Sequence, residues 1–443
     1  MELRTTGELF SYIESFTNLE KAESLYRQET YRLERIRAWL ARFGDPQEAP
    51  QVIHVAGSKG KGSTAALIAA VLTARGWKTG LYTSPHVESY LERIQVNGLP
   101  PEEGLLLKLG NRIRREIESL PGGAGTNALQ PTTFEALTLL AFLCFREAGC
   151  SHAVIETGIG GRLDATNVVS PLCAVITPIE LEHTEVLGPT LRHITREKGG
   201  IIKPGRPAFC GFQEAEVREV LAEVGREREA EILFLQDELE RLGATCSPSG
   251  TQVRLKLRGD PERSFSLSLL GEFQAENAAL AYLALSRSLP IPEQAYRLGF
   301  RRAALPARLE LLSASPPLIL DAAHTPRSVA RVLDSFRRLF GPQGVLLFGA
   351  VAGKRIAEMA LILAPAFEEV IITTPGGFKE SRPLEVLQAF QALNPRARLI
   401  PAPQEALREA LALARGRRPL LVTGSFYLAG EIKRSFRLRG QAP

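Results

Sequence analysis

The chain begins with a long segment in which apolar residues recur at helical spacing. Within residues 7–43 they stand in sets three or four positions apart, at Leu9, Phe10, Ile13, Leu33, Ile36 and Leu40. This period places apolar side chains on one face of a helix. We therefore predict that residues 7–43 are helical.

Short apolar strands and helices then alternate up to about residue 177. The predicted strands are QVIHVA (51–56), TGLYTS (79–84), HAVIET (152–157) and CAVIT (173–177). The predicted helices are 64–75, rich in alanine and leucine, and 132–148, which follows a stretch marked by glycine and proline near 121–131. Strands that alternate with helices are typical of a mostly parallel, doubly wound sheet.

A different pattern covers residues 252–270. VRLKL (253–257) and FSLSL (265–269) alternate strictly between apolar and polar side chains on either side of the turn-like GDPE. This alternation predicts a small antiparallel hairpin. A helix over 271–289 is expected to follow it.

A second series of strands and helices begins near residue 300, after a predicted linker at 289–292. Its predicted strands are 318–322, 345–350, 369–374, 398–402 and 419–424, and its helices start near 326, 355, 383 and 404, with a last helix after 424. We predict an α/β protein with two domains. Residues 1–295 form a doubly wound, mostly parallel sheet domain with a small antiparallel β element, and residues 296–443 form a smaller, Rossmann-like α/β domain.

Composition and charge narrow the class of protein. The 443 residues are 44% hydrophobic and 23% charged, as in a soluble globular protein. The net charge is only +5 and the basic residues are scattered, whereas a nucleic-acid-binding protein usually carries a stripe or tail of lysine and arginine. We predict a monomer that acts on small molecules, without nucleic-acid or membrane partners.

Three features concern the compartment. No apolar run reaches the length of a membrane helix, and the N-terminus lacks the pattern of a signal peptide. The five cysteines form no C-x-x-C pair, which favours free thiols in a reducing compartment. We therefore predict a cytoplasmic protein.

Residues 54–64, HVAGSKGKGST, join a predicted strand to a predicted helix and resemble a phosphate-binding loop. In the usual pattern, G-x-x-x-x-G-K-[ST], the lysine directly precedes the hydroxyl residue, but here Gly62 separates Lys61 from Ser63. The glycines let backbone N–H groups approach phosphate oxygens, Lys61 is placed to neutralise the β- and γ-phosphates, and Ser63 to ligate Mg²⁺. The alternative is a glycine turn with a purely structural role. The flanking strand and helix favour a nucleotide site in a P-loop domain.

Two later stretches add candidate metal ligands and cations. Glu156 ends the strand of HAVIETGIGGRLDATN, where a sheet of this type places its ligand crevice, and a carboxylate there suits Mg²⁺. His183 stands among acidic residues in TPIELEHTEVLGPTLRHITREKGGIIKPG, and Lys198 lies near the end of a predicted helix. Each has a plainer interpretation: a strand-end acid, a structural histidine, and a cation at a helix C-terminus.

The second domain carries three further candidates. Asp321 and His324 of DAAHTP follow a predicted strand, where they either meet a ligand or cap the next helix. Arg308 of PARLE lies near the predicted domain junction, from which an arginine can reach a nucleotide phosphate.

In combination these motifs resemble those of one family. GSKGKGS, YTSPH, TFEALT, ETGIGGRLDATN, EHTEVLG…REKGGIIKPG, GEFQAENAALA, PARLE, DAAHTP and VTGSFYLAGE occur in one order and with fitting spacing, between about residues 30 and 437. This arrangement resembles folylpolyglutamate synthase and the related dihydrofolate synthase, of the Mur ligase superfamily. The resemblance implies a P-loop ATP-binding domain, a C-terminal α/β domain and catalysis in the cleft between them. It also implies a ligase that uses ATP to convert a folate-type carboxylate into an acyl phosphate, which L-glutamate then attacks.

The resemblance also implies roles for individual residues. Nucleotide contacts fall on Gly57, Gly60, Lys61, Gly62, Ser63, Thr64, Gln274, Asn277, Arg308 and Asp321. Ligands of two Mg²⁺ ions fall on Ser63, Ser84, Glu156, His183 and Lys198, the last as a carbamate, which turns a cation into a carboxylate-like anion. Catalytic roles fall on Lys61, His183, Lys198, Asp321 and His324. The segment 85–93 corresponds to a mobile loop at the pterin side of the acceptor pocket.

The chain departs from the family pattern at several positions. They are Ser58-Lys59 in place of Thr-Asn, Glu182 in place of Asp, Phe273 in place of His, Thr325 in place of Asn, and Lys354 in AGKR in place of DKD. The departures leave the acceptor open: dihydropteroate, reduced folates or both. Two alternatives remain, a Mur-type ligase for a different small carboxylate and a P-loop nucleotide-binding module without ligase turnover.

Overall fold

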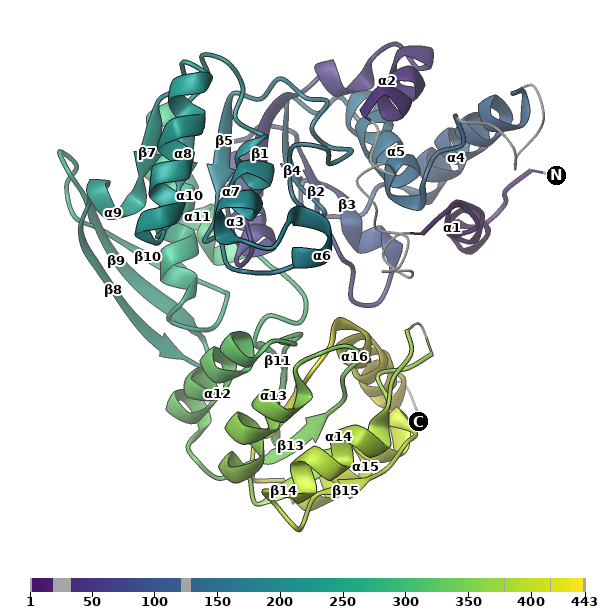
Figure 1. The fold of residues 1–443 in the computed structure, drawn as a ribbon, viewed down its shortest axis with the longest axis vertical. Coiled ribbons are helices and arrows are strands. Elements are labelled where there is room, and N and C mark those ends of the chain that lie inside the picture. Colours follow the sequence, from purple (N-terminus) through teal and green to yellow (C-terminus); the bar gives the residue numbers. More distant parts are fainter. Residues whose placement is uncertain (1, 19–32, 121–128, 378, 415, 441–443) are drawn as a thin grey trace.

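The computed structural model describes residues 2–18, 33–120, 129–377, 379–414 and 416–440, which form two α/β units (Figure 1). In the view of Figure 1 the first unit, coloured purple to teal, lies above the second, coloured green to yellow. The small sheet of β8, β9 and β10 projects at the left edge of the first unit.

The first unit holds helices α1 (Thr6–Glu14), α2 (Leu33–Arg42), α3 (Lys61–Ala74), α4 (Glu103–Glu118), α5 (Thr133–Glu147), α6 (Thr184–Leu187), α7 (Leu191–Gly199), α8 (Ala215–Glu227), α9 (Leu235–Glu238), α10 (Gln274–Ser288) and α11 (Glu293–Arg302). Its strands are β1 (Gln51–Ala56), β2 (Thr79–Tyr82), β3 (Ile94–Val96), β4 (His152–Glu156), β5 (Cys173–Ile176), β6 (Ala208–Cys210), β7 (Ile232–Phe234), β8 (Leu239–Ser247), β9 (Gly250–Leu257) and β10 (Arg263–Leu267).

The second unit holds helices α12 (Pro326–Phe340), α13 (Ile356–Leu363), α14 (Pro383–Gln391), α15 (Pro403–Ala414) and α16 (Phe426–Gly440). Its strands are β11 (Glu310–Ala314), β12 (Pro317–Leu320), β13 (Val345–Phe348), β14 (Glu369–Ile372), β15 (Arg398–Leu399) and β16 (Leu420–Thr423).

The main sheet of the first unit has the strand order β3-β2-β4-β1-β5-β6-β7. Its neighbouring strands are parallel except for β2 and β3. Alternate side chains of β1 enter apolar clusters on opposite faces: Ile53 packs with residues of α3 and α10, whereas Val52 packs with residues of α1, α4 and α5. Helices thus cover both faces, which is why the central strands are apolar almost throughout. The predicted doubly wound, mostly parallel sheet is confirmed.

The predicted hairpin is also present. β9 and β10 pair antiparallel, with Val253 opposite Phe265, and β8 adds a third strand. Val253, Leu255 and Phe265 are buried while Arg254 is exposed, so the alternation of the sequence separates a packed face from a solvated one. The packed face joins the cluster that contains α10 and α11.

The connection at 289–292 does not separate the two units. It joins α10 to α11, and α11 packs against α3 and β10 with Tyr296 and Phe300 in their cluster. The interpretation of 289–292 as a linker between domains is therefore wrong, because its two prolines divide one helix from the next inside the first unit. The division at 295 and 296 stays a prediction, and we propose that the chain passes between the units later, at 303–309.

The second unit contains a sheet of order β11-β12-β16-β13-β14-β15, parallel except for β11 and β12. β13 lies inside it with every residue buried. Leu346 packs in the cluster of α12, α13 and α14, while Leu347 packs in that of α15 and α16. This unit confirms the predicted C-terminal α/β fold.

Several predicted elements differ in extent. The helix predicted over 7–43 consists of α1 and α2, and residues 19–32 between them lie outside the described part, as do 121–128 of the glycine- and proline-marked stretch. α4 was not among the predicted helices. The strand predicted at 398–402 pairs only at its first two residues, in β15.

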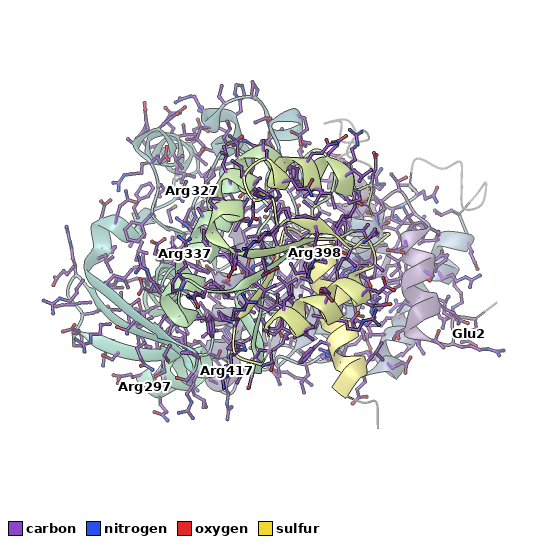
Figure 2. The ribbon with its side chains drawn as sticks, turned by 90° about the horizontal axis from the view of Figure 1, so that it is seen from below. Glu2, Arg297, Arg327, Arg337, Arg398 and Arg417 are labelled. Carbon is purple, nitrogen blue, oxygen red and sulfur yellow. The ribbon has the colours of Figure 1, made fainter. Side chains whose placement is uncertain are left out.

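Two surface properties bear on the predicted partners. Within the described residues, no helix combines the length and the apolar character that crossing a membrane requires. The arginines labelled in Figure 2, at 297, 327, 337, 398 and 417, lie apart from one another instead of forming one stripe.

Candidate active site

A cavity of about 360 Å³ lies between the two units and takes its walls from both. Ser58, Lys59, Gly60, Lys61, Gly62, Ser63, Ser84, Glu156, His183 and Asn277 line it from the first unit. Arg308, Asp321, His324, Arg327, Arg331, Lys354, Lys379, Ser425, Phe426 and Tyr427 line it from the other side. Most residues predicted for the site therefore share one cavity, although they come from opposite ends of the chain.

The topology of the main sheet explains the first wall. β1 lies between the parallel strands β4 and β5, so the carboxyl ends of the three strands meet at one edge. The glycine loop follows β1, Glu156 ends β4, and Thr177 follows β5. Side chains more than a hundred residues apart thus converge at this edge.

The glycine loop is shaped by close contacts with its neighbours. Gly57 has φ +140°, and a Cβ atom there would lie 1.9 Å from the Thr177 Oγ1 atom. Gly60 is the N-cap of α3 with φ +88°, and its Cβ would lie 2.4 Å from Asn277 Oδ1. Both positions therefore require glycine. The loop leads into the N-terminus of α3, where unpaired N–H groups and the helix dipole attract an anion.

Two lysines converge on one carbonyl group behind this loop. Lys61 Nζ donates to Gly57 O at 3.1 Å, and Lys198 Nζ donates to the same oxygen at 2.8 Å. Lys198 comes from the last turn of α7, is only 1% exposed and does not line the cavity. Burial lowers the pKa of Lys198 to about 8, against the opposing effect of the Glu182 carboxylate. The amine of Lys198 is thus far easier to deprotonate than that of an ordinary lysine.

Glu182 links the lysines of the site. Its Oε1 atom lies 3.1 Å from Lys198 Nζ and its Oε2 atom lies 3.4 Å from Lys59 Nζ. Burial alone would raise the pKa of Glu182, but Lys198, Lys59 and Lys61 hold it well below its usual range. The extra lysine of the loop, Lys59, is therefore partnered by the residue that replaces the family's aspartate.

Glu156 is the buried carboxylate of the first wall. It is 3% exposed, and its Oε2 atom accepts a hydrogen bond from the backbone N–H of Ser84 at 3.1 Å. Burial raises the pKa of Glu156, and Lys61, the Ser84 N–H and Arg308 oppose the rise. The carboxylate therefore faces cations from both sides of the cavity.

His183 has a strained backbone at the rim of the cavity. It is the N-cap of α6 with φ 51°, a left-handed conformation that few residues other than glycine adopt. Its side chain is 42% exposed, and Nδ1 lies 3.9 Å from Glu185 Oε1. Residues in such conformations cluster at binding sites, which makes His183 a candidate ligand.

On the opposite wall, Arg308 lies over an aromatic ring. Its guanidinium carbon is 4.7 Å from the centre of the Phe426 ring, and Nη1 donates to Ala307 O at 3.1 Å. Burial lowers the pKa of Arg308, while Asp321 and Glu156 favour its charged form. Phe426 belongs to the VTGSFYLAGE stretch but is not among the predicted site residues.

Asp321 and His324 do not cap the helix that follows them. The Asp321 Oδ2 atom accepts from Leu309 N at 2.8 Å and Oδ1 from Ala323 N at 2.7 Å. Thr325 caps α12 instead, in a capping box with Ser328. Threonine caps the helix here as asparagine also can, and His324 faces the cavity.

His324 is held in its neutral form. Burial, together with the charges of Lys59, Lys354 and Arg308, lowers its pKa to about 3, against the opposing effect of the hydrogen bond to Ala322. Its Nδ1 atom lies 2.9 Å from Ala322 O, which can only accept, so Nδ1 carries the proton and Nε2 is an acceptor.

The residues predicted near the adenine form a buried amide pair. Asn277 Nδ2 donates to Gln274 Oε1 at 2.8 Å, and the Thr64 hydroxyl lies 3.5 Å from Asn277 Oδ1. Asn277 lines the cavity, whereas Gln274 and Thr64 are wholly buried behind it. Gln274 Nε2 has no hydrogen-bond partner among the described residues.

Some contacts across the cavity were not expected from the sequence. Arg327 of α12 pairs with Glu180 of the first unit, with 3.0 Å between Nη1 and Oε1. Glu180 in turn follows β5 and exchanges backbone hydrogen bonds with the Ser58 hydroxyl. No local pattern marks such a pair, because the two residues are brought together only by the packing of the units.

Comparisons with known proteins agree with this architecture. Residues 55–285 match the Mur ligase middle domain, and residues 307–426 match the Mur ligase glutamate ligase domain. Dihydrofolate synthase/folylpolyglutamate synthase of Bacillus subtilis is 35% identical over 334 residues, which are 74% of this chain and 77% of that protein. Folylpolyglutamate synthase of Lacticaseibacillus casei is 31% identical over 433 residues, 97% of this chain and 98% of that protein.

A solved structure is similar throughout. Mycobacterium tuberculosis folylpolyglutamate synthase complexed with ADP and AMPPCP superposes with a TM-score of 0.83 at 29% identity, over 93% of this chain and 96% of that one. The resemblance seen in the motifs is therefore confirmed over both units. The chain is an ATP-dependent ligase and belongs to the folylpolyglutamate and dihydrofolate synthase family of the Mur ligase superfamily.

Proposed function

We propose that this ligase converts the carboxylate of a folate-type acceptor into an acyl phosphate and couples it to the amine of L-glutamate. The observation that carries the proposal is the single cavity in which the glycine loop and Glu156 of one unit face Arg308 of the other. A carboxylate is a poor electrophile until it is phosphorylated, so the enzyme must hold a triphosphate and two anionic reactants in line. Similarity to a protein that binds ADP and AMPPCP supports a nucleotide at the loop.

The proposed nucleotide contacts follow the geometry of the two walls. The loop between Gly57 and Ser63 would surround the triphosphate with N–H groups, and Lys61 would neutralise its charge. Arg308 would contact the γ-phosphate from the other side and stabilise the charge that develops during transfer. Asn277, which lines the cavity and donates to the buried Gln274 behind it, suits the adenine.

The side chains that line the cavity suit Mg²⁺, which water and substrate phosphates help to bind, better than a metal ion whose ligands all come from the protein. No three histidine, cysteine, aspartate or glutamate side chains of the described residues are placed to hold one ion. Ser63, Ser84, Glu156 and His183 nevertheless line the same cavity. Mg²⁺ commonly takes one carboxylate and completes its shell with water and substrate phosphates, and when bound it would polarise those phosphates.

Lys198 fits a second metal only after modification. As an ammonium group it donates to Gly57 O and to Glu182, and it cannot bind a metal because a protonated amine has no lone pair. A lysine with a pKa of about 8 is partly neutral near pH 8, and the neutral amine adds to CO₂ to form a carbamate with release of a proton. We propose this carbamate as a ligand, with Lys59 and Lys61 as the nearby cations that offset its charge.

The neutral His324 is proposed to act on the incoming amine. Because its pKa is near 3, it cannot serve as a cation, but its Nε2 atom can accept a hydrogen bond from the amine of L-glutamate. Asp321 already accepts two backbone N–H groups, so we propose that it positions Arg308 and His324 and does not take up a proton itself.

The acceptor is tested by phosphate release from ATP in the presence of Mg²⁺ and L-glutamate. Dihydropteroate and a reduced folate are supplied separately, because the similar proteins carry both synthase names. Release that depends on glutamate and on at least one pterin carboxylate supports the proposal. Phosphate release that requires neither glutamate nor a pterin carboxylate would contradict the proposal. Release only with an unrelated small carboxylate would favour the alternative, a Mur-type ligase for a different acceptor.

We further propose that the protein acts in the cytoplasm, and its being a monomer stays a prediction from the sequence. Support for the compartment comes from its cysteines, all five of which are free, with Cys144, Cys150, Cys173 and Cys210 buried. Burial raises the pKa of the Cys144, Cys173 and Cys210 thiols, which keeps them unreactive.

A further inference from the structure

The backbone on both sides of Arg308 is strained. Ala307 has φ 51° and Leu309 has φ 48°, both in the left-handed region that disfavours residues with a Cβ atom. Two such residues flanking one arginine cost free energy and persist only where their surroundings hold them. This conformation turns the Arg308 side chain into the cavity and over the Phe426 ring.

Each strained residue is held by a carboxylate. Leu309 N donates to Asp321 Oδ2 at 2.8 Å, and Ala307 N donates to Glu310 Oε2 at 2.9 Å. Ala307 O in addition accepts from Ala322 N at 3.0 Å. Glu310 is thus as directly connected to the strained segment as Asp321, although it does not line the cavity.

The second oxygen of Glu310 is bound by a buried lysine. Lys433 of α16 is 7% exposed, and its Nζ atom lies 2.6 Å from Glu310 Oε1. Glu310 is therefore surrounded by two donors, one on each carboxylate oxygen. A short charge-assisted bond to a buried lysine fixes the orientation of the partly exposed Glu310 carboxylate.

The same lysine faces a carboxylate of the first unit. Glu88 Oε2 lies 3.9 Å from Lys433 Nζ and 2.9 Å from Arg437 Nη2. The contact is close: a Cβ atom at Gly430 would lie 2.1 Å from Val87 O. Lys433 therefore stands where the segment 85–93 of one unit rests on α16 of the other.

From these contacts we infer that Glu310 and Lys433 are positioning residues for Arg308. Lys433 orients Glu310, Glu310 holds Ala307 in its left-handed conformation, and this conformation directs the guanidinium group toward the γ-phosphate. The inference rests on the proposed contact between Arg308 and that phosphate. Glu310 and Lys433 would thus support the site without contacting a substrate.

The test compares two nucleotides that differ in the γ-phosphate. Dissociation constants of AMPPCP and ADP are measured by calorimetric titration for the wild type, Arg308→Ala, Glu310→Gln and Lys433→Met. A glutamine at 310 must turn its NH₂ group toward one of two donors, so it loses one of the two bonds. We expect AMPPCP to bind about tenfold more weakly to Arg308→Ala and about threefold more weakly to the other two, with ADP changed by less than about twofold.

Double variants separate positioning from general destabilisation. In the Arg308→Ala background, Glu310→Gln and Lys433→Met should cause no further loss of AMPPCP affinity, because the group they position is gone. Equal losses for ADP and AMPPCP, additive losses in the double variants, or unchanged AMPPCP affinity would each overturn the inference. The Glu310→Gln/Lys433→Met variant leaves neither charge unpaired and gives the same comparison if Lys433→Met alone does not fold.

Arg434→Met is the matched control. Arg434 neighbours Lys433 on α16, is exposed, and pairs at 3.4 Å with Glu431, so the same type of substitution should leave both affinities unchanged. The nucleotide titrations need no acceptor. Failure of glutamate- and folate-dependent phosphate release would therefore count against the proposed function alone, while the affinity cycle still decides the role of Glu310 and Lys433.

Discussion

At the scale of single residues, the proposed chemistry depends on how far each lysine of the site is buried. Lys198 is almost wholly buried, so burial brings its pKa to about 8, whereas Lys61 lines the cavity. Two lysines that share the Gly57 carbonyl are thus placed in different environments. One is suited to hold a phosphate as a cation, and the other to react as an amine.

Replacing Lys198 tests the carbamate. We expect Lys198→Ala to lower kcat by about 100-fold, as loss of an electrostatic group at a reacting centre commonly does. Under ¹³CO₂ the wild type should show a carbamate NMR signal that grows from pH 7 to pH 9, because the amine loses its proton near pH 8. The matched control is the Lys203→Ala variant, because burial also lowers the pKa of Lys203 to about 8. Full activity of Lys198→Ala, or the same signal in that variant, would contradict the assignment.

At the scale of elements, the loop after β1 depends on contacts made by neighbouring strands. Gly57 touches Thr177 behind β5, and Gly60 touches Asn277 of α10. The buried strand β1 further carries His54, whose Nε2 atom lies 2.9 Å from the Thr166 hydroxyl. That hydroxyl donates to Asp164, so Nε2 of His54 must be the donor of the pair.

Gly57→Ala should destabilise the protein more than another glycine substitution of similar φ. A Cβ at Gly57 would meet Thr177 Oγ1 at 1.9 Å, whereas Gly76, with φ +97°, has no atom within 4 Å of its Cβ position. We expect a loss of about 3 kcal/mol or more for Gly57→Ala and about 1 kcal/mol for Gly76→Ala in urea unfolding. Equal losses for both would show that the contact with Thr177 is unimportant.

His54 should make stability fall in acid. Burial lowers its pKa from 6.5 to about 3, with Lys203 adding to the effect, so only the unfolded chain takes up a proton between these values. Stability therefore rises with pH in this window and is lost as pH falls below 6.5. Between pH 7 and pH 5, the wild type should lose about 2 kcal/mol more than His54→Asn in the free energy of unfolding. A constant difference between the two proteins would refute this.

Local patterns could predict much of the fold but not its junctions. The pattern of apolar residues predicts the strands, the glycines predict the loop, and strict alternation of apolar and polar residues predicts the hairpin of β9 and β10. The helix α4 was not predicted although its apolar residues recur at helical spacing, because Gly104 and Gly110 weaken a helix. In the structure, Gly110 lies where the helix contacts Leu9. The place of α11 depends on the packing of Tyr296 and Phe300, which prolines at 290 and 292 do not reveal.

The residues of the site divide in the same way: a local sequence pattern marks some of them, and only the packing of separate elements brings the others together. Lys61 begins α3 after the glycine loop, and Glu156 and Asp321 stand at strand ends, so all three could be found from the sequence. The pairs of Glu182 with Lys198, Arg308 with Phe426 and Glu310 with Lys433 join separate elements, so no spacing marks them. Their detection requires the packing of the two units.

At the scale of the whole molecule, each of the two units supplies one wall of the cavity, and in the proposed function both walls take part in catalysis. The first contributes the anion-binding loop and Glu156, and the second contributes Arg308 and His324. The pair of Arg327 with Glu180 and the contact of Glu88 with α16 bridge the units on two sides. Such a shared cavity suits a reaction that transfers a phosphoryl group between substrates, because both walls must be in place to hold the reactants before transfer.

The central claim, an acyl phosphate between ATP and the amide product, is tested most directly with a labelled acceptor. The acceptor carboxylate is enriched in ¹⁸O and incubated with the enzyme, ATP, Mg²⁺ and L-glutamate, and the released phosphate is examined by mass spectrometry. If the carboxylate attacks the γ-phosphate and the amine then displaces phosphate, one ¹⁸O atom passes to each phosphate and one stays in the amide. Amide formation with unlabelled phosphate would contradict the account.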